Sequence, residues 1–230
     1  MTRRFQRDAS LLAAGLAAAA ILLASAITGG AAAVPASTLS PPKTAEMKPG
    51  PDGFIRRWLV LEPIAATGLT DSIVQAAVKK GPFATELSAI PRDGEKVTFD
   101  NTQLTWHALD TANYNLNLFQ FARSLDKNTS NVLFWAVTVV VAPREIRDVR
   151  LAIGSNAASV WWASGQEVIG IYGDRQTVID DGVSKRLTLK KGPNVIRAAV
   201  VNGGGATDFC ARILDASDKP LTDFVVNLHP

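Results

Sequence analysis

Few side chains in this sequence could carry out nucleophilic catalysis. The chain has 230 residues and two histidines, His107 and His229. A serine hydrolase needs a histidine base beside its serine and an acid that orients the base. His229 is the penultimate residue, and chain ends are commonly mobile. His107 is therefore the remaining candidate for a catalytic base, and the sequence contains no G-x-S-x-G motif.

Other catalytic and metal chemistry has equally little support. Glycoside hydrolysis needs two facing carboxylates, and the sequence pairs none of its scattered glutamates, Glu62, Glu86, Glu145 and Glu167. The single cysteine, Cys210, excludes an intrachain disulfide and a multi-cysteine zinc site. The aspartates at 174, 180 and 181 lack EF-hand spacing and are typical of turns. We therefore expect no metal site and no cofactor.

Carbohydrate binding requires less. An aromatic ring can cover the C–H face of a sugar while amides bind its hydroxyl groups, and the candidates for these roles are Trp106, Tyr114, Trp162, Tyr172, Asn113 and Asn115. Covering about 100 Å² of ring at roughly 25 cal/mol/Å² contributes about 2.5 kcal/mol. With one or two hydrogen bonds the affinity reaches only the millimolar range. Such weak sites suit a polymeric ligand, because avidity raises retention.

The tryptophans differ in their expected burial. Trp135 lies within the apolar run 132–141 (VLFWAVTVVV), so we expect it in the core. Trp161 and Trp162 are adjacent and must point to opposite faces of a strand. We expect Trp161 in the core and Trp162 to be the more exposed of the two.

The elements that would position these residues are mostly short strands separated by turns. Period-two alternation predicts strands around Trp106, from Tyr114 through Leu118, and from Phe209. One helix is expected, from Asp71 to Lys79. Further strands are expected at 54–63, 96–100, 132–141, 149–153 and 195–201, and a hairpin is expected from 159–163 and 166–172 around Ser164-Gly165. This pattern predicts an all-β antiparallel β-sandwich with one short helix.

The N-terminal region predicts export. Residues 1–33 combine three arginines, an apolar stretch and a small-residue cleavage site after Gly29-Gly30, a pattern typical of a signal peptide. The alternative is that this stretch is retained as a membrane anchor. Residues 34–53 contain five prolines and are interpreted as a linker, and residues 54–230 as the folded domain. We expect a periplasmic, extracellular or cell-surface protein that has no membrane contact after cleavage.

The charge balance argues against nucleic acid as a partner. The whole chain has 24 basic and 21 acidic residues, but Arg3, Arg4, Arg7 and Asp8 lie in the leader. The remaining 21 basic and 20 acidic residues make the body nearly neutral. Nucleic-acid binding needs a concentrated basic surface, so we expect none.

Several motifs resemble the galactose-binding-like β-sandwich, a jelly-roll domain appended to bacterial glycoside hydrolases and esterases. The family's G-S-D-D run, V-W-L-N-G hairpin, L-K-x-G-x-N motif and closing arginine correspond here to 154–157, 161–165, Leu189-Lys190 with Gly192 and Asn194, and Arg212. Residues 58–63 (WLVLEP) are similar to the family's first strand. Taken by themselves, Gly154, Ser155 and Asn156 predict a turn at the end of a strand. The family's paired acids are Asn156 and Ala157 here, which weakens any calcium site at this loop.

The resemblance implies a secreted, non-catalytic carbohydrate-binding β-sandwich, accessory to polysaccharide breakdown or cell-surface adhesion. Two alternatives stay open. One is a carbohydrate esterase of the acetyl-xylan-esterase type, with His107 as its base. The other is a structural module that binds a protein partner.

Overall fold

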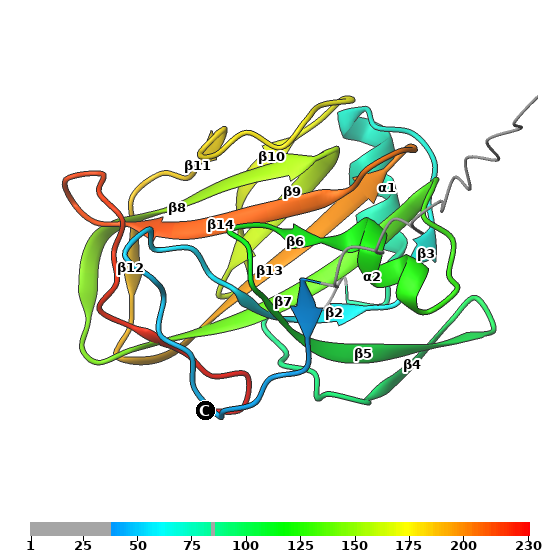
Figure 1. The fold of residues 1–230 in the computed structure, drawn as a ribbon. Coiled ribbons are helices and arrows are strands. Elements are labelled where there is room, and N and C mark those ends of the chain that lie inside the picture. Colours follow the sequence, from blue (N-terminus) through cyan, green and yellow to red (C-terminus); the bar gives the residue numbers. More distant parts are fainter. Residues whose placement is uncertain (1–37, 84–85) are drawn as a thin grey trace, which may run out of the picture. The chain divides into compact units, whose positions relative to one another are not determined.

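The computed structural model describes residues 38–83 and 86–230, which fold as an antiparallel β-sandwich (Figure 1). The larger sheet has the order β1 (Leu39–Ser40), β5 (Thr102–Thr111), β2 (Arg57–Leu61), β7 (Val132–Ala142), β13 (Gly192–Asn202), β9 (Ala158–Ala163) and β10 (Gln166–Ile171). Added to it are β3 (Ile64–Ala65) and β15 (Val225–Val226) beside β7, and β4 (Lys96–Phe99) beside β5. The smaller sheet has the order β11 (Gly182–Val183), β8 (Ile146–Asn156), β14 (Asp208–Leu214) and β6 (Leu116–Asn117), with β12 (Leu187–Leu189) beside β8. The predicted fold class is confirmed.

The core between the sheets is built around aromatic side chains. Trp58 of β2 and Trp161 of β9 both meet Phe209 of β14 edge to face, at centroid distances of 4.9 and 5.4 Å. All three rings are at most 1% exposed. Since Phe209 belongs to the smaller sheet, this cluster joins the two layers. The expectation that Trp161 lies in the core is confirmed.

The central strands and one hairpin also follow the sequence pattern. β7 pairs with β13 without interruption, from Val132 opposite Asn202 to Ala142 opposite Gly192. The hairpin between β9 and β10 turns at Ser164 and Gly165, whose φ angles are 48° and 83°. Two positive φ angles are what a tight two-residue hairpin requires.

The described residues form two short helices where the sequence predicts one. Helix α1 (Asp71–Lys80) is the predicted helix. Helix α2 (Leu118–Ser124) is not predicted by the sequence, and of the strand expected from Tyr114 through Leu118 only β6 (Leu116–Asn117) forms. The side-chain oxygen of Asn117 accepts a hydrogen bond from the backbone N–H of Gln120 at 2.8 Å. This N-cap starts the helix, and Leu118, Phe121 and Ala122 bury one of its faces.

The expected linker is part of the folded unit over its described residues, 38–53. β1 pairs with β5 through Leu39 and Ser40, and Met47 forms a bridge with Val226 of β15. The buried Arg57 donates to the Thr44 carbonyl at 2.7 Å. The linker interpretation of residues 38–53 is therefore wrong, because backbone pairing holds this proline-rich stretch against the sandwich.

The predicted signal peptide lies outside the described residues. Within the described ranges, no helix combines the length and the apolar character needed to cross a membrane.

Candidate functional site

A one-residue bulge separates β2 from β3 and opens the larger sheet. Val60 faces Ala136 of β7 and Ile64 faces Leu133, so four residues advance along one strand against three on the other. Beyond this point β3 pairs with β7 alone, whereas β2 also pairs with β5. The backbone N–H of Glu62 still donates to the Thr105 carbonyl at 3.1 Å. The bulge therefore ends the pairing with β5 and leaves a gap beside β3.

Two adjoining cavities of about 310 and 330 Å³ occupy this gap and the space next to it. Both are lined by Ile64, Ala65, Phe99 and Asp100, so we treat them as one depression, the β3 groove. The first cavity is completed by Pro63, Thr102, Leu104, Lys127, Asn128 and Val132. The second extends toward α1 and is completed by Ala66, Thr67, Ile73, Ala76, Ala77, Lys80, Gly81 and Leu133. Each cavity lies within the range of about 300–1,000 Å³ typical of small-molecule sites.

An acid on a hairpin tip contributes to both cavities. β4 and β5 pair from Lys96 opposite Thr105 to Phe99 opposite Thr102, which leaves Asp100 and Asn101 as the connecting loop. Their φ angles are 44° and 60°, which is typical of the tight turn that aspartate and asparagine favour. The turn thus places an exposed carboxylate beside the half-buried ring of Phe99.

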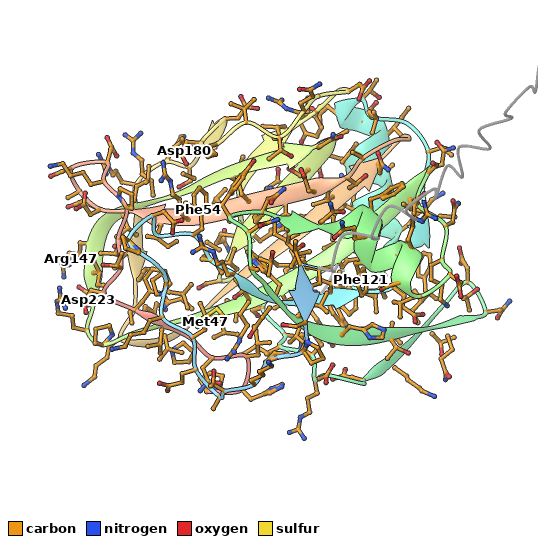
Figure 2. The ribbon with its side chains drawn as sticks, in the orientation of Figure 1. Met47, Phe54, Phe121, Arg147, Asp180 and Asp223 are labelled. Atoms are coloured by element: carbon orange, nitrogen blue, oxygen red, sulfur yellow. The ribbon has the colours of Figure 1, made fainter. Side chains whose placement is uncertain are left out.

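A charged cluster adjoins the first cavity. The Nζ atom of Lys127 lies 3.1 Å from Oε2 of Glu62, whose side chain is 11% exposed. On the other side of this carboxylate, Nε2 of His107 lies 3.5 Å from Oε1. The His107 ring also meets Phe121 of α2 edge to face at 5.5 Å, and Figure 2 labels Phe121. Glu62 therefore holds the ammonium group of Lys127, which lines the groove and can donate hydrogen bonds there.

The contacts of His107 do not form a catalytic triad. Its recorded partners among the described residues are the Glu62 carboxylate and the Phe121 ring. The Glu62 carboxylate is close to the imidazole, but no hydrogen bond is recorded at His107 Nε2, and no serine hydroxyl is recorded beside the imidazole in the described part of the chain. A serine nucleophile within hydrogen-bond reach is the first geometric requirement of such a hydrolase. No contact seen here favours the esterase alternative.

The structure contradicts the expected ligand-facing positions of Trp106 and Trp162, because their rings are 0% and 3% exposed. Trp162 stacks on Trp135 at 5.7 Å, and Phe83 covers Trp106 at 5.3 Å. Trp162 does point away from the Trp161 cluster, as alternation requires. That face of the sheet is itself covered, by a stretch that we call the cover segment, Phe83 with residues 86–91. Neither ring can therefore present a flat face to a sugar in this structure.

The asparagine and tyrosine candidates lie in other parts of the molecule, and none of them lines the β3 groove. Tyr114 is 39% exposed and packs on Phe54 at 5.4 Å. The Asn115 amide donates to Asp208 at 2.7 Å, and the Asn113 carbonyl accepts from Arg56 at 3.1 Å.

The Phe54 ring, on which Tyr114 packs, is also in contact with one member of an ion pair. Arg212 of β14 lies over the Phe54 ring at 5.0 Å and pairs with Asp180, and Figure 2 labels Phe54 and Asp180. The hydrogen bond to Asp180 is the main cause that raises the pKa of Arg212. Tyr114 therefore sits beside an internally satisfied charge cluster, and its proposed role in binding stays a prediction.

Tyr172 lies beside α1. Its hydroxyl accepts a hydrogen bond from the Gln75 amide at 3.0 Å, and burial is the main cause that raises its pKa. Its role in binding also stays a prediction.

Sequence reasoning missed the groove residues themselves. Two local signals mark the groove: Pro63, which lacks the N–H needed to continue pairing, and the Asp100-Asn101 pair, which favours a tight turn. Neither signal shows that the bulge and the hairpin tip lie next to each other, because they are far apart in sequence.

Comparisons with known proteins identify no family. No family model and no curated protein matches the chain. Among solved structures, the PA14 sugar-binding domain from an RTX adhesin is 14% identical with a TM-score of 0.39, covering 73% of this chain and 94% of that domain. The PA14 domain of an antifreeze protein is 11% identical with a TM-score of 0.41, covering 74% and 89%.

A beta-glucosidase from Kluyveromyces marxianus in complex with glucose is 17% identical with a TM-score of 0.38. The match covers 72% of this chain but only 17% of the enzyme. Likenesses at this level establish neither a shared family nor a shared ligand.

Proposed function

We propose that this protein binds carbohydrate, without modifying it, through the β3 groove. The observation that carries the proposal is the pair of joined cavities, about 310 and 330 Å³, whose shared wall offers both apolar surface and a carboxylate. Sugars have the same mixed character, with apolar C–H faces and a rim of hydroxyl groups.

The lining provides a partner for each part of a sugar ring. The half-buried Phe99 ring and Ile64 offer apolar contact to C–H groups. The carboxylate of Asp100 accepts hydrogen bonds from hydroxyls, while Lys127 and Asn128 donate to hydroxyl oxygens. Because Glu62 already neutralises Lys127, the first cavity has no strong preference for an anion. A neutral polyhydroxyl ligand fits this balance better than a phosphate does.

The arrangement of the two cavities favours a polymer over a single sugar. Both share Asp100 and Phe99, so neighbouring sugar units can lie on either side of the hairpin tip. Each unit is held weakly, by a partly exposed ring and a few hydrogen bonds of about 1 kcal/mol each. Repeated weak contacts along a chain raise retention through effective concentration.

The finer assignments belong to the same proposal. We infer that the sandwich is of the galactose-binding-like type, supported by the motifs at 154–157, 161–165 and 189–194. We also infer export to the periplasm, the cell surface or the medium, supported by the composition of residues 1–33. An accessory role in polysaccharide breakdown or adhesion follows from these two inferences.

Retention of the full chain on insoluble polysaccharides, together with a glycan array, tests the proposal. We expect binding to at least one glycan and a loss of about tenfold in affinity in Asp100→Ala, the size expected when a hydrogen bond to a charged group is removed. Asp174→Ala is the matched control, because Asp174 is also an exposed loop acid but does not line the groove. Wild-type chain that binds no glycan would reject the proposed function. Binding that persists unchanged in Asp100→Ala would reject the groove as its site.

A protein-interaction role is the competing outcome. Cross-linking that recovers one constant protein partner, in a preparation that binds no glycan, would replace the carbohydrate proposal with that role.

A further inference from the structure

A third cavity of about 160 Å³ opens between the two sheets, where the β9–β10 hairpin turns. Its walls come from both layers, with β8, β12 and β14 on one side and β9, β10 and β13 on the other. We call it the intersheet slot. Its principal apolar wall residues are Val149, Leu151, Val168, Leu187, Ile196 and Ile213.

Both sheets carry a register shift at this cavity. The pairing of β10 with β9 is irregular at Val168, which stands as an extra residue in β10. The pairing of β12 with β8 shifts between Leu187 and Leu189, opposite the stretch of β8 that contains Asp148, whose φ is 57°. Bulges re-aim side chains and bend strands, and they occur often beside binding sites. The slot therefore coincides with a local departure from regular pairing in each layer.

The interior of the slot suits a compact apolar group. Val149, Leu151 and Ile213 contribute to its walls and are at most 1% exposed, so the slot reaches the side chains of the core. An apolar cavity of about 150 Å³ stays dry and accepts a benzene-sized molecule. A group of that size would gain contacts with both sheets.

The rim of the slot is polar and carries a positive charge. Lys190 lines the slot and is exposed, and no ion pair is recorded for it within the described ranges. Asn194 fixes the backbone at this point, accepting from the Lys190 N–H and donating to the Lys190 carbonyl, both at 2.8 Å. The ammonium group of Lys190 thus starts from an anchored backbone position at the slot and is free to meet an anion.

We propose that the intersheet slot binds a small aromatic acid, with the ring between the sheets and the carboxylate at Lys190. Apolar walls select the ring, and the unpaired ammonium selects the charge. The slot shares no lining residue with the β3 groove, so this site is independent of the proposed carbohydrate binding.

Benzoate titrated into the full chain, observed by methyl NMR, tests the site. We expect saturable shifts of the methyl signals of Val149, Leu151 and Ile213. Benzyl alcohol has the same ring without the charge and should bind about fivefold more weakly, the contribution of one partly exposed charge. Lys190→Gln should lower the affinity for benzoate by about the same factor and leave that for benzyl alcohol unchanged.

Filling the slot provides the second arm of the experiment. Val168→Trp should abolish binding of both probes, whereas Val183→Trp should not, because Val183 is an exposed strand valine outside the slot. If Val168→Trp does not fold, Ala163→Leu fills the same space with a smaller side chain. The absence of saturable shifts in the wild type, or equal binding in the filled variants, would overturn the site. Equal benzoate binding in Lys190→Gln would overturn the choice of an acid.

Discussion

The guanidinium group of Arg197 lies 4.9 Å from the ring centroid of Phe83. It also donates to the backbone carbonyls of Leu87 and Ala89, at 3.0 and 2.6 Å. Arg197 belongs to β13 and is fully buried, whereas its three partners belong to the cover segment. One side chain of the sheet therefore binds the segment that hides Trp106 and Trp162.

Arg197 is buried, and no carboxylate among the described residues forms an ion pair with it, so burial disfavours its charged form. Desolvation lowers its pKa to about 10, against an ordinary value of 12.5. The neutral form is still a small minority near neutral pH, so the residue stays charged and needs its carbonyl acceptors. The cover segment supplies these acceptors, which explains why the segment and the arginine depend on each other.

Arg197→Ala should release the cover segment. Two hydrogen bonds from a charged donor and the contact with Phe83 are lost, so we expect unfolding to become easier by about 3 kcal/mol. Chemical denaturation measures this loss, and a red shift of tryptophan emission reports exposure of the covered rings. Arg147→Ala is the control, because Arg147 is 77% exposed in a surface ion pair and its removal should leave stability nearly unchanged. Equal stability of the two variants would contradict this role of Arg197.

The sheet architecture could be predicted from the sequence because period-two patterns report directly on local geometry. The apolar run 132–141 and the alternation around Trp106 correctly predicted a central strand and a strand with one buried face. The opposite faces of Trp161 and Trp162 were also predictable. The pattern could not show that the second face is covered as well, because the cover segment reaches it through contacts between residues distant in the chain, such as Arg197 and Leu87.

The candidate site was harder to predict for a related reason. The β3 groove arises from a bulge after Val60 and from the Asp100-Asn101 turn, which meet only in the folded chain. The strand expected from Tyr114 through Leu118 includes Asn117, yet Asn117 ends β6 and its short side chain caps helix α2. Asparagine is depleted in strands and favoured at N-caps, so its own preference pointed to the cap, but the period-two alternation of its neighbours favoured a strand.

Gly154 has a role other than the turn predicted for it. It lies within β8, and a Cβ atom at this position would stand 2.1 Å from the carbonyl oxygen of Val178. Gly154→Ala should therefore displace the loop that carries Asp180, the partner of Arg212, and destabilise the fold by about 1–3 kcal/mol. Thermal unfolding measures the loss. Gly204→Ala is the control, because a Cβ atom at that position would have its nearest neighbouring heavy atom 4.0 Å away. Similar losses of stability in both variants would refute the close approach at Gly154.

The N-cap of α2 can be tested separately. Asn117→Ala removes the acceptor for the Gln120 N–H and should cost about 1 kcal/mol of stability. Asn117→Asp keeps an acceptor and should remain within a few tenths of a kcal/mol of wild type. Urea denaturation of the three chains decides the matter. If the aspartate variant lost as much as the alanine variant, the cap would not be the source of the effect.

Cys210 offers a test of how tightly the loop that contains Val178 covers the outer face of β14, because Phe209 points into the core between the sheets and its neighbour Cys210 points the other way. The residue is 2% exposed, and burial is the main cause that raises the pKa of its thiol to about 12, from an ordinary value of 9.0. Because pH 8 lies below both values, the native protein should hold about a thousandfold less thiolate at that pH than the unfolded chain does. Thiolate is the reactive form, so a maleimide should label the native protein very slowly and the urea-unfolded protein at once. If the native protein were labelled at the rate of the unfolded chain, Cys210 would not be covered as the structure shows. Gly154→Ala disturbs the loop next to Cys210, so it should raise the labelling rate of the native protein.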